Sequence, residues 1–188
     1  MVHDLILSRK SIRAFDERPV DDETLINLFE AARWAPSSRN EQPWRFISAR
    51  RGEAAFSQMV SSLYEGNRTW AQHAAALILV LTKKHFENGA LNTHAQFDTG
   101  LAVANLSLQA TAMDLYLHQM GGFDALLAQK YFEVPAEYES CILIAAGYKG
   151  NPEQLPENLR SRETMHRQRK PLEEIVFSNR FGEPSNLF

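Results

Sequence analysis

The sequence predicts an α+β domain of about four strands and five or six helices, and three observations lead to this class. An aliphatic run at 75–82 has the length and composition of a strand that is buried on both faces. Apolar residues recur at alternating spacings of four and three over 93–115, which is typical of a long helix. A length of 188 residues suits one domain, so we expect 1–188 to fold as a unit with 151–188 as an extended C-terminal arm.

Helices and strands are expected to alternate in the first half of the chain. Asp21 can cap a helix that ends near Pro36, because the residue before a proline avoids the α conformation. The apolar face of this helix carries Leu25, Leu28, Phe29 and Ala32. A short strand over 44–49 follows, and then a second helix with a face made of Phe56, Met59, Val60 and Leu63.

The long helix has the character of a coiled-coil seam, formed by Phe97, Leu101, Ala104, Leu108, Thr111 and Leu115. Such a helix can form a domain core or a subunit interface. Strands are expected over 116–120 and 140–148, and between them a helix that Asp124 caps and that runs through Tyr131. The polar C-terminal arm shows little regular pattern but ends in apolar groups at 175–177 and 187–188, so it could wrap a partner subunit or simply fray.

Composition and charge argue against several classes of function. The formal net charge of −3 is unfavourable for a general nucleic-acid partner, which requires a basic face. A single cysteine, Cys141, excludes a disulfide within the chain and favours a reduced compartment. The N-terminus lacks the features of a signal peptide and no apolar run could span a bilayer, so we expect a cytoplasmic protein without membrane partners. The histidines show no metal-ligand spacing, and there is no Gly-x-Gly-x-x-Gly motif for a Rossmann dinucleotide site.

Two basic segments suit an anionic ligand, because arginine forks match phosphate oxygens. The first, at 8–13, combines cations and hydroxyls in Ser8, Arg9, Lys10, Ser11 and Arg13. In the second, Arg167 and Arg169 alternate in a segment that would point both side chains the same way if extended. The alternatives are a solvated basic helix end and a charged surface tail.

Two loops could contact other parts of a ligand. The loop at 35–44 is stiffened by prolines and presents donors and acceptors that can read a heterocycle edge, namely Ser37, Ser38, Asn40 and Gln42. Gly121 and Gly122 would let backbone N–H groups approach a ligand closely. An ordinary polar turn and a tight turn before Asp124 are the alternatives.

These segments, in this order, resemble the FMN-dependent nitroreductases. Ser-Arg-Lys-Ser-Ile-Arg at 8–13 is similar to the Arg-x-Ser-x-Arg opening of that family, and 35–44 is similar to its Pro-Ser-x-x-Asn-x-Gln-Pro-Trp segment. Gly-Gly-Phe-Asp at 121–124 and Arg-x-Arg-x-Pro-Leu-Glu-Glu at 167–174 also fit. The resemblance spans essentially the whole chain.

The resemblance implies a nitroreductase-like fold, with a mixed central sheet flanked by helices, and an intertwined homodimer with FMN in two interfacial sites. Arg9, Arg167 and Arg169 would hold the phosphate, and Lys10 would also belong to the cofactor-binding residues. Ser11 would face the ribityl chain, and Arg13 would place positive charge near N1 and O2 of the pyrimidine. Ser37, Ser38, Asn40 and Gln42 would come from the other subunit, and Pro36 beside them would also belong to the cofactor-binding residues.

The same resemblance places the N–H of Gly121 or Gly122 at flavin N5, with Asn67 or Arg68 at the ring edge. It implies ping-pong hydride transfer from NAD(P)H to FMN and on to small electron-poor acceptors such as nitroaromatics or quinones, with no protein acid or base required. Trp70, Phe86 and Phe123 are candidate pocket residues, with core packing as the alternative.

Other functions stay open from the sequence alone. The chain is short where relatives often carry substrate-covering helices. A same-fold flavin enzyme of different chemistry, such as dehalogenation, enoate reduction or flavin fragmentation, would share these residues. A flavin-binding or sensor protein without turnover, or a structural dimer without a cofactor, are further alternatives.

Overall fold

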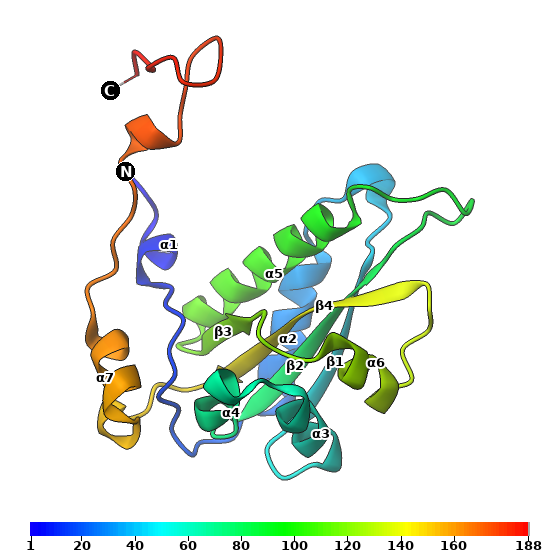
Figure 1. The fold of residues 1–188 in the computed structure, drawn as a ribbon, viewed down its shortest axis with the longest axis vertical. Coiled ribbons are helices and arrows are strands. Elements are labelled where there is room, and N and C mark those ends of the chain that lie inside the picture. The colour runs from blue at the N-terminus through cyan, green and yellow to red at the C-terminus, as the bar shows by residue number, and fades with distance from the viewer. Residues whose placement is uncertain (188) are drawn as a thin grey trace.

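A four-stranded sheet lies between two layers of helices in the computed structural model, which describes residues 1–187 (Figure 1). The strands follow the order β1-β2-β4-β3 across the sheet. Their bounds are β1 (Trp44–Arg50), β2 (Ala76–Lys83), β3 (Tyr116–Met120) and β4 (Tyr138–Gly147). All four strands predicted from the sequence are confirmed. Phe188, one of the predicted terminal apolar residues, lies outside the described part of the chain.

Every neighbouring pair of strands is antiparallel, so the sheet of residues 1–187 differs from the mixed sheet that the resemblance implied. A mixed sheet would need a further strand running parallel to an edge strand. The rest of the described chain forms helices, loops and the arm instead.

Strand β2 is buried on both faces, as its aliphatic run predicted. One face directs Leu77, Leu79 and Leu81 into a core shared with the helices α3 (Ala54–Ser62), α4 (Glu65–Ala71) and α6 (Ala125–Tyr131). The other face directs Ala76, Ile78 and Val80 against α2 (Asp22–Arg33) and α5 (Ala95–Ala112). The alternation of side chains along one strand therefore links the two helical layers.

Local capping explains where two helices begin. The Asp21 carboxylate accepts the Thr24 N–H at 2.7 Å at the start of α2, and the Asp124 carboxylate accepts the Leu127 N–H at 2.9 Å at the start of α6. Both caps were predicted. The helices α1 (Asp4–Ser8), α4 and α7 (Glu157–Thr164) were not, because each has at most eight residues and is too short to show a helical period.

Helix α5 buries a different face from the predicted seam. Its side toward the sheet consists of Ala102, Val103, Leu106 and Ala110, together with buried polar residues. From the predicted seam, Phe97 is 69% exposed and Leu101 and Leu108 are half-buried. The helix carries apolar residues on both faces, so periodicity alone could not decide which one packs on the sheet. Leu115 of the predicted seam lies beyond the end of the helix and is buried in the core, whereas Phe97 and Ala104 are exposed, so the earlier part of the seam is open to contact outside the chain.

The N-terminal segment joins the end of the sheet and meets the C-terminal arm there. The Gly150 N–H donates to Ala14 O at 2.8 Å, and the Asp16 N–H donates to Tyr148 O at 3.0 Å. Gly150 is required here, because a Cβ atom would lie 2.5 Å from the carbonyl carbon of Phe15.

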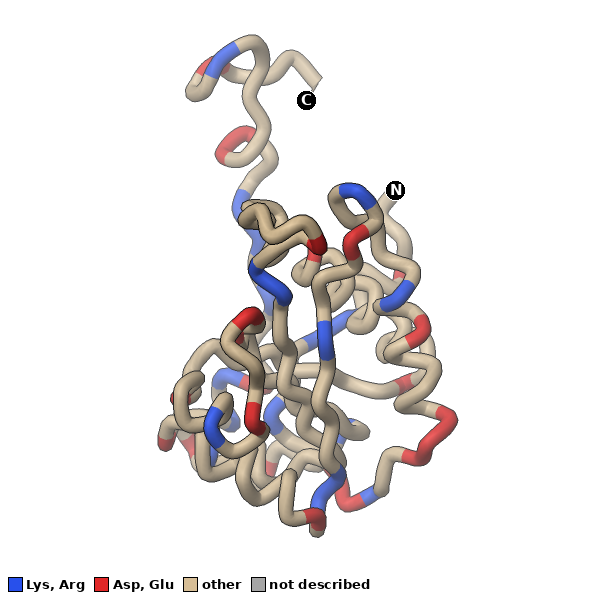
Figure 2. The backbone as a smooth tube through the Cα atoms, turned by 90° about the vertical axis from the view of Figure 1, so that its right-hand side faces the viewer, with Lys and Arg blue, Asp and Glu red and all other residues tan. Residues whose placement is uncertain are grey.

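Beyond α7 the arm leaves the body of the molecule, with Lys and Arg along its rising part (Figures 1 and 2). Ile175 and Phe181 of the arm are 58% and 93% exposed. Among residues 1–187, no helix combines the length and apolar character needed to cross a bilayer.

Candidate functional site

Four of the predicted site residues line one cavity of about 420 Å³ where the N-terminal segment meets the arm. Arg9, Lys10 and Ser11 come from the segment that follows α1, and Arg167 comes from the arm. The rest of the wall consists of Ile12, Arg162, Glu163, Met165, His166 and Gln168.

The arginines of this cavity reinforce one another's positive charge. The Arg167 guanidinium donates to the carbonyl oxygens of Leu7 and Arg9, which docks the arm on the N-terminal segment. Burial, Arg167 and the exposed Arg169 all lower the pKa of Arg9. Arg9 donates to Ser11 Oγ at 3.2 Å, but it forms no ion pair with any carboxylate of residues 1–187. An uncompensated group of cations with a hydroxyl beside it is a suitable site for an anion.

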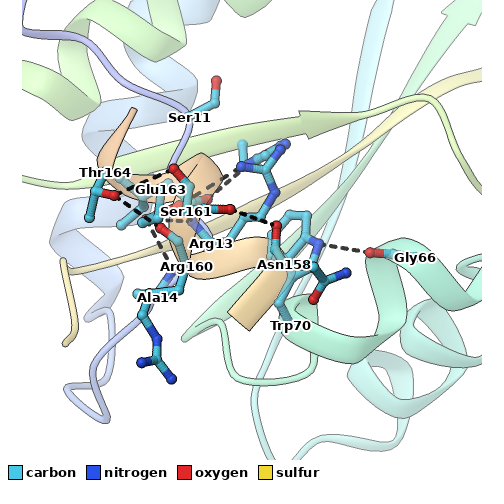
Figure 3. A network of polar contacts seen from close by, with 12 residues as sticks. Ser11, Arg13, Ala14, Gly66, Trp70, Asn158, Arg160, Ser161, Glu163 and Thr164 are labelled. Carbon is cyan, nitrogen blue, oxygen red and sulfur yellow. Dashed lines mark hydrogen bonds and ion pairs between the residues drawn. The ribbon is translucent and has the colours of Figure 1, made fainter. Parts of the chain in front are cut away.

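Arg13 is held differently, by a buried carboxylate on α7 (Figure 3). The Arg13 N–H lies 2.9 Å from Glu163 Oε1 and 3.0 Å from Oε2, and the Ala14 N–H lies 3.3 Å from Oε1. Arg13 Nη1 lies 3.8 Å from Glu163 Oε2, and the Glu163 side chain is only 5% exposed. Arg13 lines a neighbouring cavity of about 240 Å³ rather than the Arg9 cavity. Glu163 was missed because its sequence context is a polar, charged tail.

His118 on β3 is hydrogen-bonded to the backbone of the N-terminal segment. Its Nδ1 lies 2.8 Å from the carbonyl oxygen of Ile12, and its ring centroid lies 4.4 Å from that of Trp70. Burial lowers the pKa of His118 to about 4, so the ring is neutral at pH 7. Because a carbonyl oxygen can only accept, Nδ1 carries the proton and donates.

The glycine pair lies beside α4, at the end of β3. The Gly122 carbonyl accepts the Tyr64 N–H at 3.1 Å and the Asn67 side-chain amide at 3.0 Å. A Cβ atom on Gly122 would lie 2.8 Å from Asn67 Nδ2, whereas the same position on Gly121 is open. Within residues 1–187 the Gly121 and Gly122 N–H groups have no hydrogen-bond acceptor, so both remain available as donors. Arg68 instead donates to Leu63 O at 2.6 Å, on the backbone after α3.

The loop at 36–42 is strained and anchored. Three non-glycine residues in and just after a short 3₁₀ helix (Ser38–Asn40) have positive φ, with 55° at Arg39, 56° at Asn40 and 49° at Gln42. The Ser37 hydroxyl accepts the Gln42 N–H at 3.0 Å. Positive φ at non-glycine residues is concentrated at functional sites. Pro36 is exposed at the start of this loop.

One chain does not bring this loop and the Arg9 cavity together. The loop is anchored at the first turn of α5 through Asp98, whereas α1 packs along the other half of that helix (Figure 1). A helix of 18 residues spans about 27 Å. The predicted site residues therefore form separate groups within the chain.

Two of the three candidate pocket aromatics belong to the core. Trp70 is 1% exposed and Phe123 is 6% exposed, and both pack in the cluster with α3 and α6. Phe86 lies in the loop after β2, with the Arg39 guanidinium 5.0 Å from its ring centroid. Core packing thus accounts for Trp70 and Phe123.

Comparison with known proteins identifies the family. The model of the nitroreductase family matches residues 6–67 and 50–148, well over half of the chain. The chain belongs to the nitroreductase family. This confirms the resemblance carried by the motifs.

Relatives of this family share both sequence and fold with the chain. A solved oxidoreductase containing FMN superposes with a TM-score of 0.93 at 33% identity, over 97% of this chain and 94% of that one. A provisionally assigned nitroreductase of Desulfovibrio desulfuricans, solved in complex with FMN, gives a TM-score of 0.75 at 26% identity, over 95% and 96% of the two chains. A Streptomyces coelicolor protein, provisionally named an NADH dehydrogenase/NAD(P)H nitroreductase, is 26% identical over 79% of this chain and 83% of its own length. The nitroreductase-like α+β fold is confirmed.

Proposed function

We propose that this nitroreductase-family chain binds FMN and transfers hydride from NADH or NADPH to small electron-poor acceptors such as nitroaromatics or quinones. The observation that carries the proposal is the uncompensated group of cations in the Arg9 cavity. The names of the FMN-containing structural relatives and of the Streptomyces coelicolor relative support the cofactor and the hydride donor.

The donor set of the cavity fits a phosphate end. Arg9, Lys10 and Arg167 supply guanidinium and ammonium groups, Arg169 adds charge nearby, and Ser11 offers a hydroxyl toward a sugar-like chain. Glu163 in the wall would oppose an anion if it were free. Its charge is taken up by Arg13 and by two backbone N–H groups, so the cavity keeps its preference for anions.

The remaining proposed contacts concern the ring. Bound FMN would supply the two-electron chemistry, because hydride transfer belongs to the flavin. Arg13 would favour negative charge at the pyrimidine edge, and a free N–H of Gly121 or Gly122 would donate toward N5. Asn67 holds the Gly122 carbonyl and so keeps the glycine pair in place at the ring edge.

The loop at 36–42 is proposed to serve a second site in a homodimer. Its separation from the Arg9 cavity within one chain supports this assignment, as do the open seam of α5 and the exposed apolar residues of the arm. Pro36 begins this loop, and Ser37, Ser38, Asn40 and Gln42 would present their polar groups to the flavin held by the other subunit.

A comparison of FMN with riboflavin tests the phosphate assignment directly, because the two differ only by the phosphate. Titration of the apoprotein should give FMN at least about 100-fold tighter binding, which corresponds to two charge-assisted hydrogen bonds. Arg9→Ala should remove most of this difference, whereas Arg180→Ala, on an exposed arm residue paired with Glu183, should preserve it. Equal affinity for FMN and riboflavin in the unmodified protein would contradict the assignment.

A further inference from the structure

We propose that Glu163 is a positioning residue of the flavin site. It fixes the backbone at Arg13 and Ala14, and it partly neutralises the positive charge that Arg13 presents to the pyrimidine edge. This inference rests on the proposed function. It concerns a residue outside every motif that the sequence singled out.

The geometry of Glu163 is that of a clamp between two distant parts of the chain. The residue lies in the last turn of α7, and its carboxylate contacts two consecutive N–H groups about 150 positions earlier. These N–H groups belong to an extended segment that has no helix of its own to satisfy them. On the opposite side, His118 donates to the carbonyl of Ile12. The segment that carries Ser11 and Arg13 is thus fixed from α7 and from β3 together.

The burial of Glu163 couples its carboxylate to the charge of Arg13. A carboxylate that is 5% exposed requires compensation, which here comes from the two N–H groups and from the Arg13 guanidinium. The Arg13 side chain is 20% exposed, so the ion pair is weakly screened by water. Arg13 therefore reaches any ligand with part of its charge already neutralised. Burial and Arg162 lower the pKa of Arg13, while Glu163 raises it, which agrees with Glu163 as the stabilising partner.

The partial neutralisation of Arg13 predicts the direction in which the relative affinity for reduced and oxidised FMN should change. Reduced flavin carries negative charge at N1 and O2, so a more positive Arg13 favours the reduced form. Loss of the Glu163 charge should therefore tighten binding of reduced FMN relative to oxidised FMN. Glu163→Gln keeps the size of the side chain and one acceptor oxygen, so it changes the charge with little loss of packing.

The clamp is tested without any cofactor by amide hydrogen exchange in the apoprotein, followed by NMR. Glu163→Ala should accelerate exchange of the Arg13 and Ala14 N–H groups at least about tenfold, because each loses its only acceptor. Glu163→Gln keeps one acceptor oxygen and the size of the side chain, so it should accelerate exchange of these two N–H groups less. Glu153→Gln is the matched control, since it removes the same charge from an exposed pair with Arg160 near α7. Unchanged exchange at Arg13 and Ala14 in both Glu163 variants would overturn the clamp.

The partial neutralisation of Arg13 by Glu163 is tested by the redox potential of bound FMN in a double-mutant cycle. Glu163→Gln should raise the ratio of the Kd for oxidised FMN to the Kd for reduced FMN about threefold to tenfold, where tenfold equals about 30 mV for a two-electron couple. In an Arg13→Gln background, and for Glu153→Gln in the unmodified background, the change should stay below about twofold. A purely structural role would weaken binding of both redox forms of FMN equally and leave the redox potential unchanged. An equal shift of the potential in both backgrounds would show that Glu163 does not act through Arg13. Either result would overturn this part of the proposal.

Failure of the proposed function would look different. A protein that binds no FMN would remove the flavin assignment, while the exchange rates at Arg13 and Ala14 would still decide whether Glu163 fixes the segment.

Discussion

The carboxylate of Asp98, in the first turn of α5, accepts the backbone N–H of Ser38 at 3.0 Å. Asp98 is only 3% exposed, and this half-buried hydrogen bond joins the long helix to the strained loop at 36–42. A buried carboxylate within an apolar helix is costly unless it is hydrogen-bonded. The Ser38 N–H supplies such a hydrogen bond, so we infer that Asp98 and the loop geometry stabilise each other.

Replacement of Asp98 should therefore loosen the loop. We expect Asp98→Ala to lower the free energy of unfolding by about 1–3 kcal/mol, because the Ser38 N–H loses its acceptor. The same variant should weaken FMN binding if the loop serves a flavin site. Asp98→Asn keeps an acceptor oxygen and should lose less on both counts. Urea unfolding and FMN titration measure the two effects, and equal stability of Asp98→Ala and the unmodified protein would contradict the anchor.

The two adjacent glycines should respond differently to the same added methyl group. Gly122→Ala would force a Cβ atom against Asn67 Nδ2 at 2.8 Å and displace that side chain, which would lose its hydrogen bond to the Gly122 carbonyl and cost about 0.5–1.5 kcal/mol of stability. Gly121→Ala meets open space and should change stability by less than about 0.5 kcal/mol. Thermal unfolding of the two apoproteins provides the comparison. A loss of similar size in both variants would show that the contact with Asn67 is not what restricts Gly122.

His118 should make the stability of the fold depend on pH. Its pKa is about 4 in the folded protein and 6.5 in a solvated reference, so the unfolded chain binds the proton more readily. Stability from this group is fully present above pH 6.5 and is lost as the pH falls toward 4, by an amount on the order of 2–3 kcal/mol. His118→Gln, which can still donate to the Ile12 carbonyl, should flatten this part of the profile. Unfolding measured from pH 7 to pH 4 tests it, and identical slopes for the two proteins would remove His118 as the cause.

The open seam of α5 should hold two chains together. We expect Leu101→Asp and Leu108→Asp to convert a dimer into a monomer, because each places a charge within an apolar interface. Leu126→Asp is the matched control, since Leu126 is 78% exposed on α6, in the opposite helical layer. Light scattering after size-exclusion chromatography gives the masses. An unmodified protein with the mass of one chain would contradict the homodimer.

Much of the fold followed from local patterns in the sequence. The caps at Asp21 and Asp124 and the aliphatic run of β2 depend on neighbouring residues, so they could be predicted without tertiary information. The buried face of α5 could not, because both faces of the helix are apolar and only packing on the sheet selects one. The antiparallel arrangement also depends on contacts between distant strands, which periodicity does not encode.

The candidate site was predictable to the extent that its residues lie in compact motifs. Arg9, Lys10 and Ser11 are adjacent in sequence, and the structure places them in one cavity with Arg167. The residues that hold these motifs in place were not predictable. Glu163, Asp98 and His118 act through long-range hydrogen bonds to backbone groups, and nothing in their local sequence distinguishes them from other polar residues.

The proposed function requires that FMN bound to this chain accepts hydride from a nicotinamide. The visible absorbance spectrum of the purified protein, reconstituted with FMN and recorded before and after anaerobic NADH and then NADPH, tests this claim. We expect a flavin spectrum that is bleached by at least one nucleotide and restored by a nitroaromatic or a quinone. A bound flavin spectrum that persists with both nucleotides would contradict the claim, and would favour a flavin-binding protein without this turnover.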